Sequence, residues 1–273
     1  METRLSRTLL ALRVWAERLI VFFKRELRIR ASYRMTMIVT IVNGVSGILA
    51  YGFLGSSAIG SVTSTAYNMS LASYLVSGVA FSPIVTSGLS TFSQYSSPSE
   101  IEDILVTPIG FRGYILASSL FRFLTTLAGT ALFFGTSIFL LGLDYSYNLP
   151  LLAFTVLLGV VMSISIGFLA LGMRLVYKQT ALLSWLLFSM TGLVGNMIVP
   201  VQVLPEAVRY VSYITPQYYF FTVIRIALGN SAVPVTSLLV PFALYSILLF
   251  GASLYVLSRG LKFVKRNGTH RWT

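Results

Sequence analysis

The chain contains no cysteine, and its single histidine, His270, lies close to the C-terminal end. Disulfide frameworks, thiolate metal sites, thiol nucleophiles and histidine-bound cofactors are therefore excluded, and most classes of enzyme with them. Charge is scarce as well: 10% of the 273 residues are charged, whereas soluble domains carry roughly 25%. This composition excludes an ordinary soluble globular domain.

Acidic residues are especially few. The chain has 8 acids against 20 basic residues, for a net charge of +12, and 56% of its residues are apolar. A basic surplus can indicate nucleic acid, but long apolar runs favour the anionic inner face of a lipid bilayer as the partner. We therefore expect membrane lipids, and no nucleic acid, around this chain.

Six stretches are long and apolar enough to cross a bilayer as helices, since about 20 such residues span a core of about 30 Å. A β-barrel would need short segments with alternating polar and apolar side chains, and that alternation is absent. The predicted fold is an all-α integral membrane protein with a six-helix domain over residues 35–257. The predicted spans are Met35–Leu54, Tyr67–Leu89, Leu116–Leu141, Leu149–Met173, Thr180–Val199 and Val235–Leu257.

The basic residues predict the orientation, because Lys and Arg in short loops stay on the cytoplasmic side. Residues 1–34 hold nine of them, and the segment from Arg259 onward holds five. The loops predicted on the opposite side contain only Arg209 and Arg225. We expect a multi-pass protein of the cell membrane with both termini in the cytoplasm and a basic tail over 258–273.

Residues 1–34 read as a basic amphipathic helix, with apolar residues every three or four positions from Leu5 to Leu27. Such a helix lies in the membrane interface with its apolar face inward. It could be an anchor alone, or a collar that also contacts a cytoplasmic partner. No cleavable signal peptide is expected, because this segment is too charged to contain an apolar targeting core.

The predicted spans contain no carboxylate and no histidine. Carriers coupled to protons or sodium usually keep such a group within the bilayer. The Gly spacing of Gly55–Ser61 resembles a phosphate-binding loop but has Ser61 in place of the required lysine. Energy for any active transport must come from another polypeptide, and no cofactor or metal site is expected in this chain.

The second span is rich in small and hydroxyl residues around Pro83. Such residues allow helices to pack closely and to hydrogen-bond within a bundle. The alternative is the wall of a polar path, for which the candidate residues are Tyr67, Ser70, Tyr74, Ser77 and Phe81.

A short acidic helix is predicted over residues 99–107, between the second and third spans. Ser99 and Glu102 form a capping box, and Pro108 ends the helix. It is either a well-capped connector or a docking element, with carboxylates that pair with a soluble partner and apolar residues that enter a groove. The docking candidates are Glu100, Ile101, Glu102, Asp103, Leu105, Thr107 and Pro108.

A broken segment follows the fifth span, over residues 200–231. Its apolar run, Tyr218–Leu228, is about half the length of a span and contains Arg225. Two short helices divided at Thr215 and Pro216 could dip into the membrane and return, or lie flat on the outer surface as an aromatic hairpin. The candidate outer-gate residues are Gly195, Pro200, Pro205, Tyr213, Pro216, Tyr219 and Arg225.

These features together resemble the type-2 ABC transporter permease family, over nearly the whole chain. The family's coupling-helix pattern of acid, Leu, Thr and Pro is matched by Glu102, Leu105, Thr107 and Pro108. Its pattern before the last span is similar to the residues Gly195, Pro200, Leu204, Pro205, Thr215, Pro216, Tyr219, Arg225 and Leu228.

The resemblance implies an ATP-driven exporter subunit without catalytic residues, paired with a second copy or a homologous permease. Separate ABC ATPase subunits would hold ATP and Mg and act through the coupling helix. The substrate expected is an amphipathic or hydrophobic solute, such as a drug, a lipid, a lipid-linked glycan or a polysaccharide. The alternatives are a secondary carrier or passive channel, and a membrane enzyme that acts on lipids.

Overall fold

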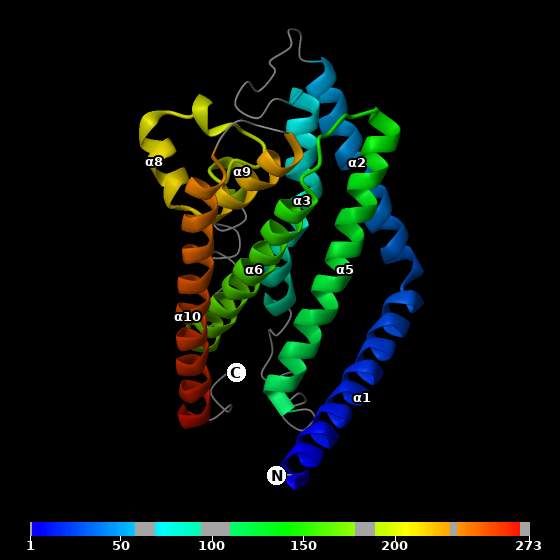
Figure 1. The fold of residues 1–273 in the computed structure, drawn as a ribbon, viewed down its shortest axis with the longest axis vertical. Helices are drawn as coiled ribbons and strands as arrows, with labels where there is room; N and C mark the ends of the chain where they lie inside the picture. Colours follow the sequence, from blue (N-terminus) through cyan, green and yellow to red (C-terminus); the bar gives the residue numbers. More distant parts are fainter. Residues whose placement is uncertain (1, 58–68, 94–109, 178–188, 230–233, 268–273) are drawn as a thin grey trace.

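The computed structural model describes residues 2–57, 69–93, 110–177, 189–229 and 234–267, and these residues are helical almost throughout (Figure 1). An isolated β-bridge joins Ser146 to Gly229. The elements are α1 (Glu2–Ser32), α2 (Arg34–Ser57), α3 (Leu71–Ser93), α5 (Gly110–Leu141), α6 (Leu149–Tyr177), the short 3₁₀ helix η1 (Val201–Val203), α8 (Glu206–Ile214), α9 (Pro216–Gly229) and α10 (Thr236–Asn267).

Five of the described helices are long and apolar enough to cross a membrane: α2, α3, α5, α6 and α10. They confirm a helical, multi-pass fold. The predicted span Thr180–Val199 lies partly outside the described residues, and its described part is helical over 189–193.

The predicted end of that span at Val199 is wrong, because the helix stops at Leu193. The amides of Val194 and Gly195 both donate to the carbonyl of Met190, which closes the last turn. Asn196 then adopts a positive φ of 60°, a left-handed conformation that a helix does not continue.

Several other helix ends differ from the predicted spans by a few residues or more, and two of them have a clear local cause. α3 begins at Leu71 because the Ser70 hydroxyl accepts the Ser73 amide at 3.1 Å and caps the helix. α10 continues past Leu257 to Asn267, into the basic segment. A helix can leave the bilayer without ending, since its backbone hydrogen bonds are satisfied internally.

Among the spans that the structure describes, two helices are central and three are peripheral. Of the most apolar 18-residue stretch in each span, 67% is buried in α3 and 50% in α6, against 11% in α2 and 17% in α5 and in α10. α3 and α6 touch through Gly88, where a Cβ would lie 1.7 Å from the carbonyl oxygen of Ser163. The Ser163 hydroxyl accepts the Gly88 amide at 2.8 Å and donates to the Val85 carbonyl, so a polar contact joins these helices inside the bundle.

Pro83 lies inside α3 and cannot donate to the carbonyl of Val79, one turn earlier. The Ser82 hydroxyl donates to that carbonyl instead, at 2.9 Å. Hydroxyl residues near Pro83 therefore repair the backbone of a buried helix, which is one reason for their abundance here.

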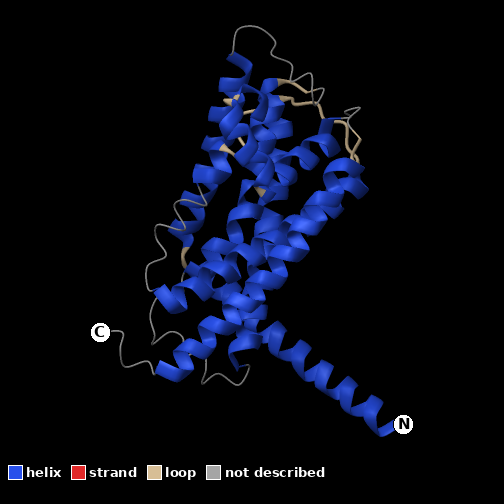
Figure 2. Ribbon diagram, turned by 90° about the vertical axis from the view of Figure 1, so that its left-hand side faces the viewer, coloured by secondary structure: helices blue, strands red, loops and turns tan. Residues whose placement is uncertain are grey.

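The N-terminal helix α1 extends away from the bundle (Figure 2). Its described contact is an aromatic cluster in which Phe22 meets Tyr114 and Phe23 meets Phe121 edge-on. Arg30 lies 4.8 Å from the centre of the Phe121 ring. This anchor fixes α1 to the start of α5 and leaves most of its described surface exposed.

Candidate functional site

α8 and α9 form a helical hairpin at the end of the bundle opposite to the start of α1 and the end of α10 (Figure 1). Thr215 breaks the chain between them with extended backbone, and Pro216 begins α9, because a proline is tolerated in a first helical turn. The predicted division at Thr215 and Pro216 is therefore present. We call this end of the molecule the hairpin end.

The two halves of the hairpin differ in burial. α8 has exposed aromatics such as Tyr210, whereas α9 is buried along most of its length. α9 packs against α3, α6, α8 and α10. A flat external position for the whole hairpin does not fit this burial of α9.

Arg225 of α9 is 1% exposed and forms the centre of a polar cluster. Its guanidinium donates to the backbone carbonyl of Asn196, to that of Met197 at 2.6 Å and to that of Tyr74 at 3.3 Å. The guanidinium carbon also lies 3.5 Å from the centre of the Tyr74 ring. A planar cation that is fully ionised can use a ring face and several carbonyls together, which suits arginine and not lysine.

Asn196 organises the other side of the cluster. Its side-chain oxygen accepts the Tyr74 hydroxyl at 2.6 Å and the Val201 amide at 3.3 Å. Its side-chain nitrogen donates to the Thr222 hydroxyl at 2.9 Å. One carboxamide thus links α3, the turn after residue 193 and α9. Asn196 has a positive φ in this turn, and the carbonyls of Asn196 and Met197 face Arg225.

Gly78 lets α3 approach the cluster closely. A Cβ at this position would lie 2.1 Å from the Met197 carbonyl oxygen and 3.0 Å from an Arg225 nitrogen. We define the Arg225 cluster as Tyr74, Gly78, Asn196, Thr222 and Arg225.

The candidate outer-gate residues are not gathered in one place. Arg225 is in the cluster, and Gly195 is just outside it. A Cβ added at Gly195 would lie 3.0 Å from the Cβ of Gln217. Pro200 and Pro205 precede η1 and α8 and set their starts.

Tyr213 and Tyr219 lie at the break between α8 and α9. The Tyr219 hydroxyl donates to the Tyr213 carbonyl at 2.9 Å. The Tyr219 ring stacks on Tyr245 of α10 with ring centres 5.7 Å apart. These contacts fasten the hairpin to α10, and a gating role for the residues stays a prediction.

The candidate path residues of the second span are also separated. Tyr67 lies outside the described residues, and Ser70 is the exposed N-cap of α3. Tyr74 and Ser77 are fully buried, and Phe81 packs on Phe134 of α5 with ring centres 5.2 Å apart. Within one chain these side chains serve packing, so their role in a path stays a prediction.

The loop between α5 and α6 holds the end of α9. The amides of Ser146 and Asn148 donate to the carbonyls of Leu228 and Ala227, at 3.0 and 2.8 Å. The carbonyls at a helix end have no partner within the helix. The loop supplies those partners and so fixes the position of α9.

Tyr145 joins the same loop to α3, since its hydroxyl donates to the Ser73 carbonyl at 3.3 Å. Burial raises the pKa of the Tyr145 phenol well above its ordinary value. The phenol therefore remains a hydrogen-bond donor over the physiological pH range.

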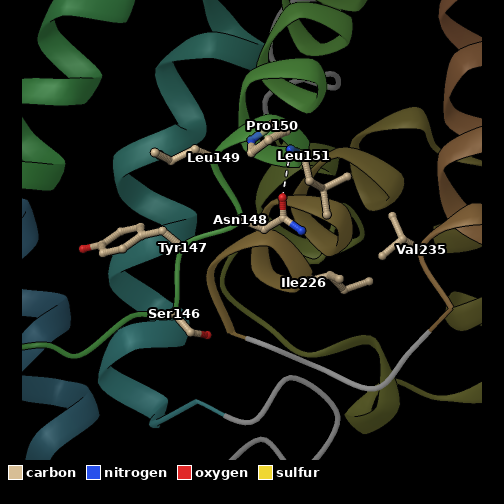
Figure 3. Close-up of a pocket in the computed structure, with 8 residues that line it drawn as sticks. All are labelled: Ser146, Tyr147, Asn148, Leu149, Pro150, Leu151, Ile226 and Val235. Atoms are coloured by element: carbon tan, nitrogen blue, oxygen red, sulfur yellow. Dashed lines mark hydrogen bonds between the residues drawn. The ribbon is translucent and has the colours of Figure 1, made fainter.

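A cavity of about 580 Å³ lies beside this loop, between the start of α6, α9 and the start of α10. Figure 3 shows Asn148, Ile226 and Val235 around it, while Tyr147 points away from them. The Asn148 carboxamide oxygen caps α6 by accepting the Leu151 amide at 3.2 Å. Ser146, Tyr147 and Asn148 line the cavity with polar groups, but the lining has no arrangement for acid–base or nucleophilic chemistry.

In the described ranges no group of three or more His, Asp or Glu side chains could hold a metal ion. The predicted docking segment, 99–107 with Pro108, lies outside the described residues. The structure therefore leaves the docking residues as a sequence prediction.

Sequence reasoning named Arg225 for the broken segment but did not identify Asn196 and Thr222 as members of the same cluster. Asn196 carried a signal, because it is a polar residue at the end of an apolar run, four residues before a proline. Thr222 carried none, since a hydroxyl in an apolar helix commonly bonds to its own backbone.

Comparison with known proteins places the chain in a family. No curated protein matches it in sequence. A family model described as ABC-2 type transporter matches residues 17–228, which is most of the chain. Members of this family are membrane-spanning permeases of ABC transporters, and the ATPase is a partner. Five helices long and apolar enough to span a membrane agree with that match. The chain therefore belongs to the ABC-2 type transporter family.

Proposed function

We propose that this chain is the permease subunit of an ATP-driven exporter for an amphipathic or hydrophobic solute. Two such permeases would form the path across the membrane, and separate ATPase subunits would supply the energy. The observation that carries the proposal is the family match over residues 17–228, together with spans that contain no carboxylate or histidine. Coupling to an ion gradient would need such a group within the bilayer.

Residues 99–107 are proposed as the coupling helix that contacts the ATPase. Three of the 8 acids of the chain, Glu100, Glu102 and Asp103, lie in this stretch, close to a predicted cytoplasmic face that is otherwise mostly basic. Carboxylates on a basic face give a soluble basic partner a distinct point of contact. Motion of the ATPase subunits would reach the bundle there.

The hairpin end is proposed as the outer gate, with the Arg225 cluster as its fixed part. The cluster ties α9 to α3 through buried hydrogen bonds. A tie of this kind makes the hairpin and the outer half of α3 move as one body. Opening would then occur between this body and the rest of the bundle, and not within the Arg225 cluster.

Transport in proteoliposomes tests the function. The permease is reconstituted with its ATPase subunit, and movement of a fluorescent phospholipid to the opposite leaflet is measured with ATP and with a non-hydrolysable analogue. ATP-dependent movement that disappears without the ATPase subunit is the expected result.

The alternatives give different results in the same assay. Uphill movement by the permease alone, driven by an imposed proton or sodium gradient, would identify a secondary carrier. Equal movement with and without ATP would identify a passive channel, and chemical conversion of the lipid would identify an enzyme. Each of these results would contradict the proposal.

A further inference from the structure

The cavity beside the loop between α5 and α6, which we call the loop cavity, lies where two spans begin. α6 begins at Leu149 and α10 at Thr236, and Ile226 of α9 lines the cavity between them. Because spans enter the bilayer at such ends, the cavity lies at the level of the membrane surface at the hairpin end. Its volume of about 580 Å³ is typical of a site for a small molecule.

The polar side of the loop cavity comes from Ser146 and Asn148. The Asn148 carboxamide oxygen caps α6, and the carboxamide nitrogen points toward the space between Ile226 and Val235 (Figure 3). In the part of the chain that the structure describes, neither this nitrogen nor the Ser146 hydroxyl hydrogen-bonds to a protein group. The nitrogen can donate, and the hydroxyl can donate and accept. Both groups are therefore available to a ligand.

The other side of the loop cavity is apolar. Leu151 of α6, Ile226 of α9 and Val235 before α10 line it. From here α6 and α10 continue into the bilayer with exposed apolar side chains, such as Phe154 and Val240. A molecule with its head group at the loop can therefore extend an apolar chain among the lipid tails beside these helices. This combination suits an amphiphile.

Charge is missing from the lining of the loop cavity. None of the described residues that line it is acidic or basic. Arg225 is next to Ile226 in sequence, but its guanidinium donates to carbonyls on the opposite side, such as that of Met197. Asp144 belongs to the same loop and is exposed, but it does not line the cavity. A charged head group would lose water here without meeting an opposite charge, which is costly.

We propose that the loop cavity binds one amphiphile with an uncharged, hydroxyl-bearing head group, such as a glycosyl head. Hydroxyl groups of the ligand would pair with the Asn148 carboxamide nitrogen and the Ser146 hydroxyl, while its chain lies against the apolar side. The same loop donates amides to the last carbonyls of α9, so the ligand contacts the connection that holds α9. This site is separate from the Arg225 cluster, and it does not require that the bound amphiphile is the exported solute.

Photo-cross-linking tests the site on the full chain in phosphatidylcholine nanodiscs, without ATP and without an ATPase subunit. The probe is dodecyl glucoside with a diazirine on the chain carbon next to the sugar. The comparison probe is dodecyl phosphate with the same diazirine. Mass spectrometry locates the label. We expect the glucoside to label the peptides that contain Leu151 and Val235 about five-fold more than the phosphate, as a difference of about 1 kcal/mol in binding would give.

Three variants locate the probe. Ser146→Ala with Asn148→Ser removes both ligand groups but keeps a capping hydroxyl on α6, and it should lower the labelling about five-fold. Val235→Trp fills the cavity while the Val235 carbonyl still accepts the amides of Leu238 and Leu239, so labelling should fall by a similar factor. Tyr147→Phe is the matched control, because its side chain belongs to the same loop but points away from the cavity (Figure 3).

Four outcomes would overturn the proposal. Equal labelling by the two probes would mean that only the chain is bound, and stronger labelling by the phosphate would make this an anion site at the start of α6. Unchanged labelling of Val235→Trp would place the probe outside the cavity. Displacement of the probe by an equal concentration of methyl glucoside would mean that a free sugar is the ligand. Since no nucleotide is present, each of these results is distinct from a failure of ATP-driven transport.

Discussion

At the residue scale, Arg225 shows how a charge is held inside an apolar bundle. The structure gives it backbone carbonyls and the ring of Tyr74 as partners. Carbonyl dipoles and a ring quadrupole can replace much of the water lost on burial if the cation is planar and its donors are fixed. The identity of the cation therefore matters here as much as its charge.

Arg225→Lys tests this point. We expect a loss of about 1–3 kcal/mol of stability, because an ammonium cannot reach all three carbonyls while lying flat on Tyr74. Thermal unfolding in detergent, followed by tryptophan fluorescence, measures the change. Arg259→Lys is the control, since Arg259 is exposed but also contacts a tyrosine ring, that of Tyr255, at 5.4 Å. An equal loss in both variants would show that burial of Arg225 is not important.

At the scale of elements, the loop between α5 and α6 determines where α9 ends. It supplies amides to two α9 carbonyls and connects to α3 through Tyr145. The loop that connects α5 to α6 therefore also joins α9 to α3. This connection explains how α9, a helix too short to span the bilayer, keeps one position inside the bundle.

Tyr145 makes this connection sensitive to alkaline pH. Burial raises the pKa of its phenol in the folded state, so above about pH 10 the unfolded chain loses this proton and the folded chain keeps it. Stability is therefore fully present below that pH and falls as the pH rises, by up to about 1.4 kcal/mol per pH unit.

Tyr145→Phe should remove that part of the alkaline loss, at a cost near neutral pH of about 0.5–1.5 kcal/mol for the lost hydrogen bond. Thermal unfolding between pH 8 and 11 measures both effects. Tyr210→Phe removes an exposed phenol and serves as the control. A Tyr145→Phe variant that loses stability as steeply as the parent would contradict this account.

At the scale of the whole molecule, charge is distributed unevenly along the chain. Basic residues gather in residues 1–34 and after Arg259, and three acids lie together in residues 100–103. A partner that binds near the predicted cytoplasmic face meets this contrast first. In the proposed docking, long-range electrostatics would guide the partner to the acids, and salt would weaken that guidance.

The double variant Glu102→Lys with Asp103→Lys tests whether those acids bind the ATPase. We expect at least a ten-fold fall in the amount of ATPase subunit that co-purifies, because two attractive contacts become repulsive. The double variant Asp144→Lys with Glu206→Lys is the control. It changes the net charge equally, but its exposed residues lie in the loop between α5 and α6 and at the start of α8. Unchanged recovery of the ATPase with the first variant would refute the docking role.

The sequence by itself determined that the chain is a helical membrane protein, because span length and hydropathy are local properties. It also located the break at Thr215 and Pro216, since proline and polar residues affect the backbone conformation of the residues next to them. Only the tertiary structure decided that Arg225 lies between Tyr74 and Asn196, residues separated from it by 151 and 29 positions. The helix end at Leu193 belongs with these, because the apolar run continues to Val199 while Asn196 turns to meet α3 and α9. Contacts between distant segments depend on how helices pack, and the sequence of one helix does not specify which residues of another helix it will contact.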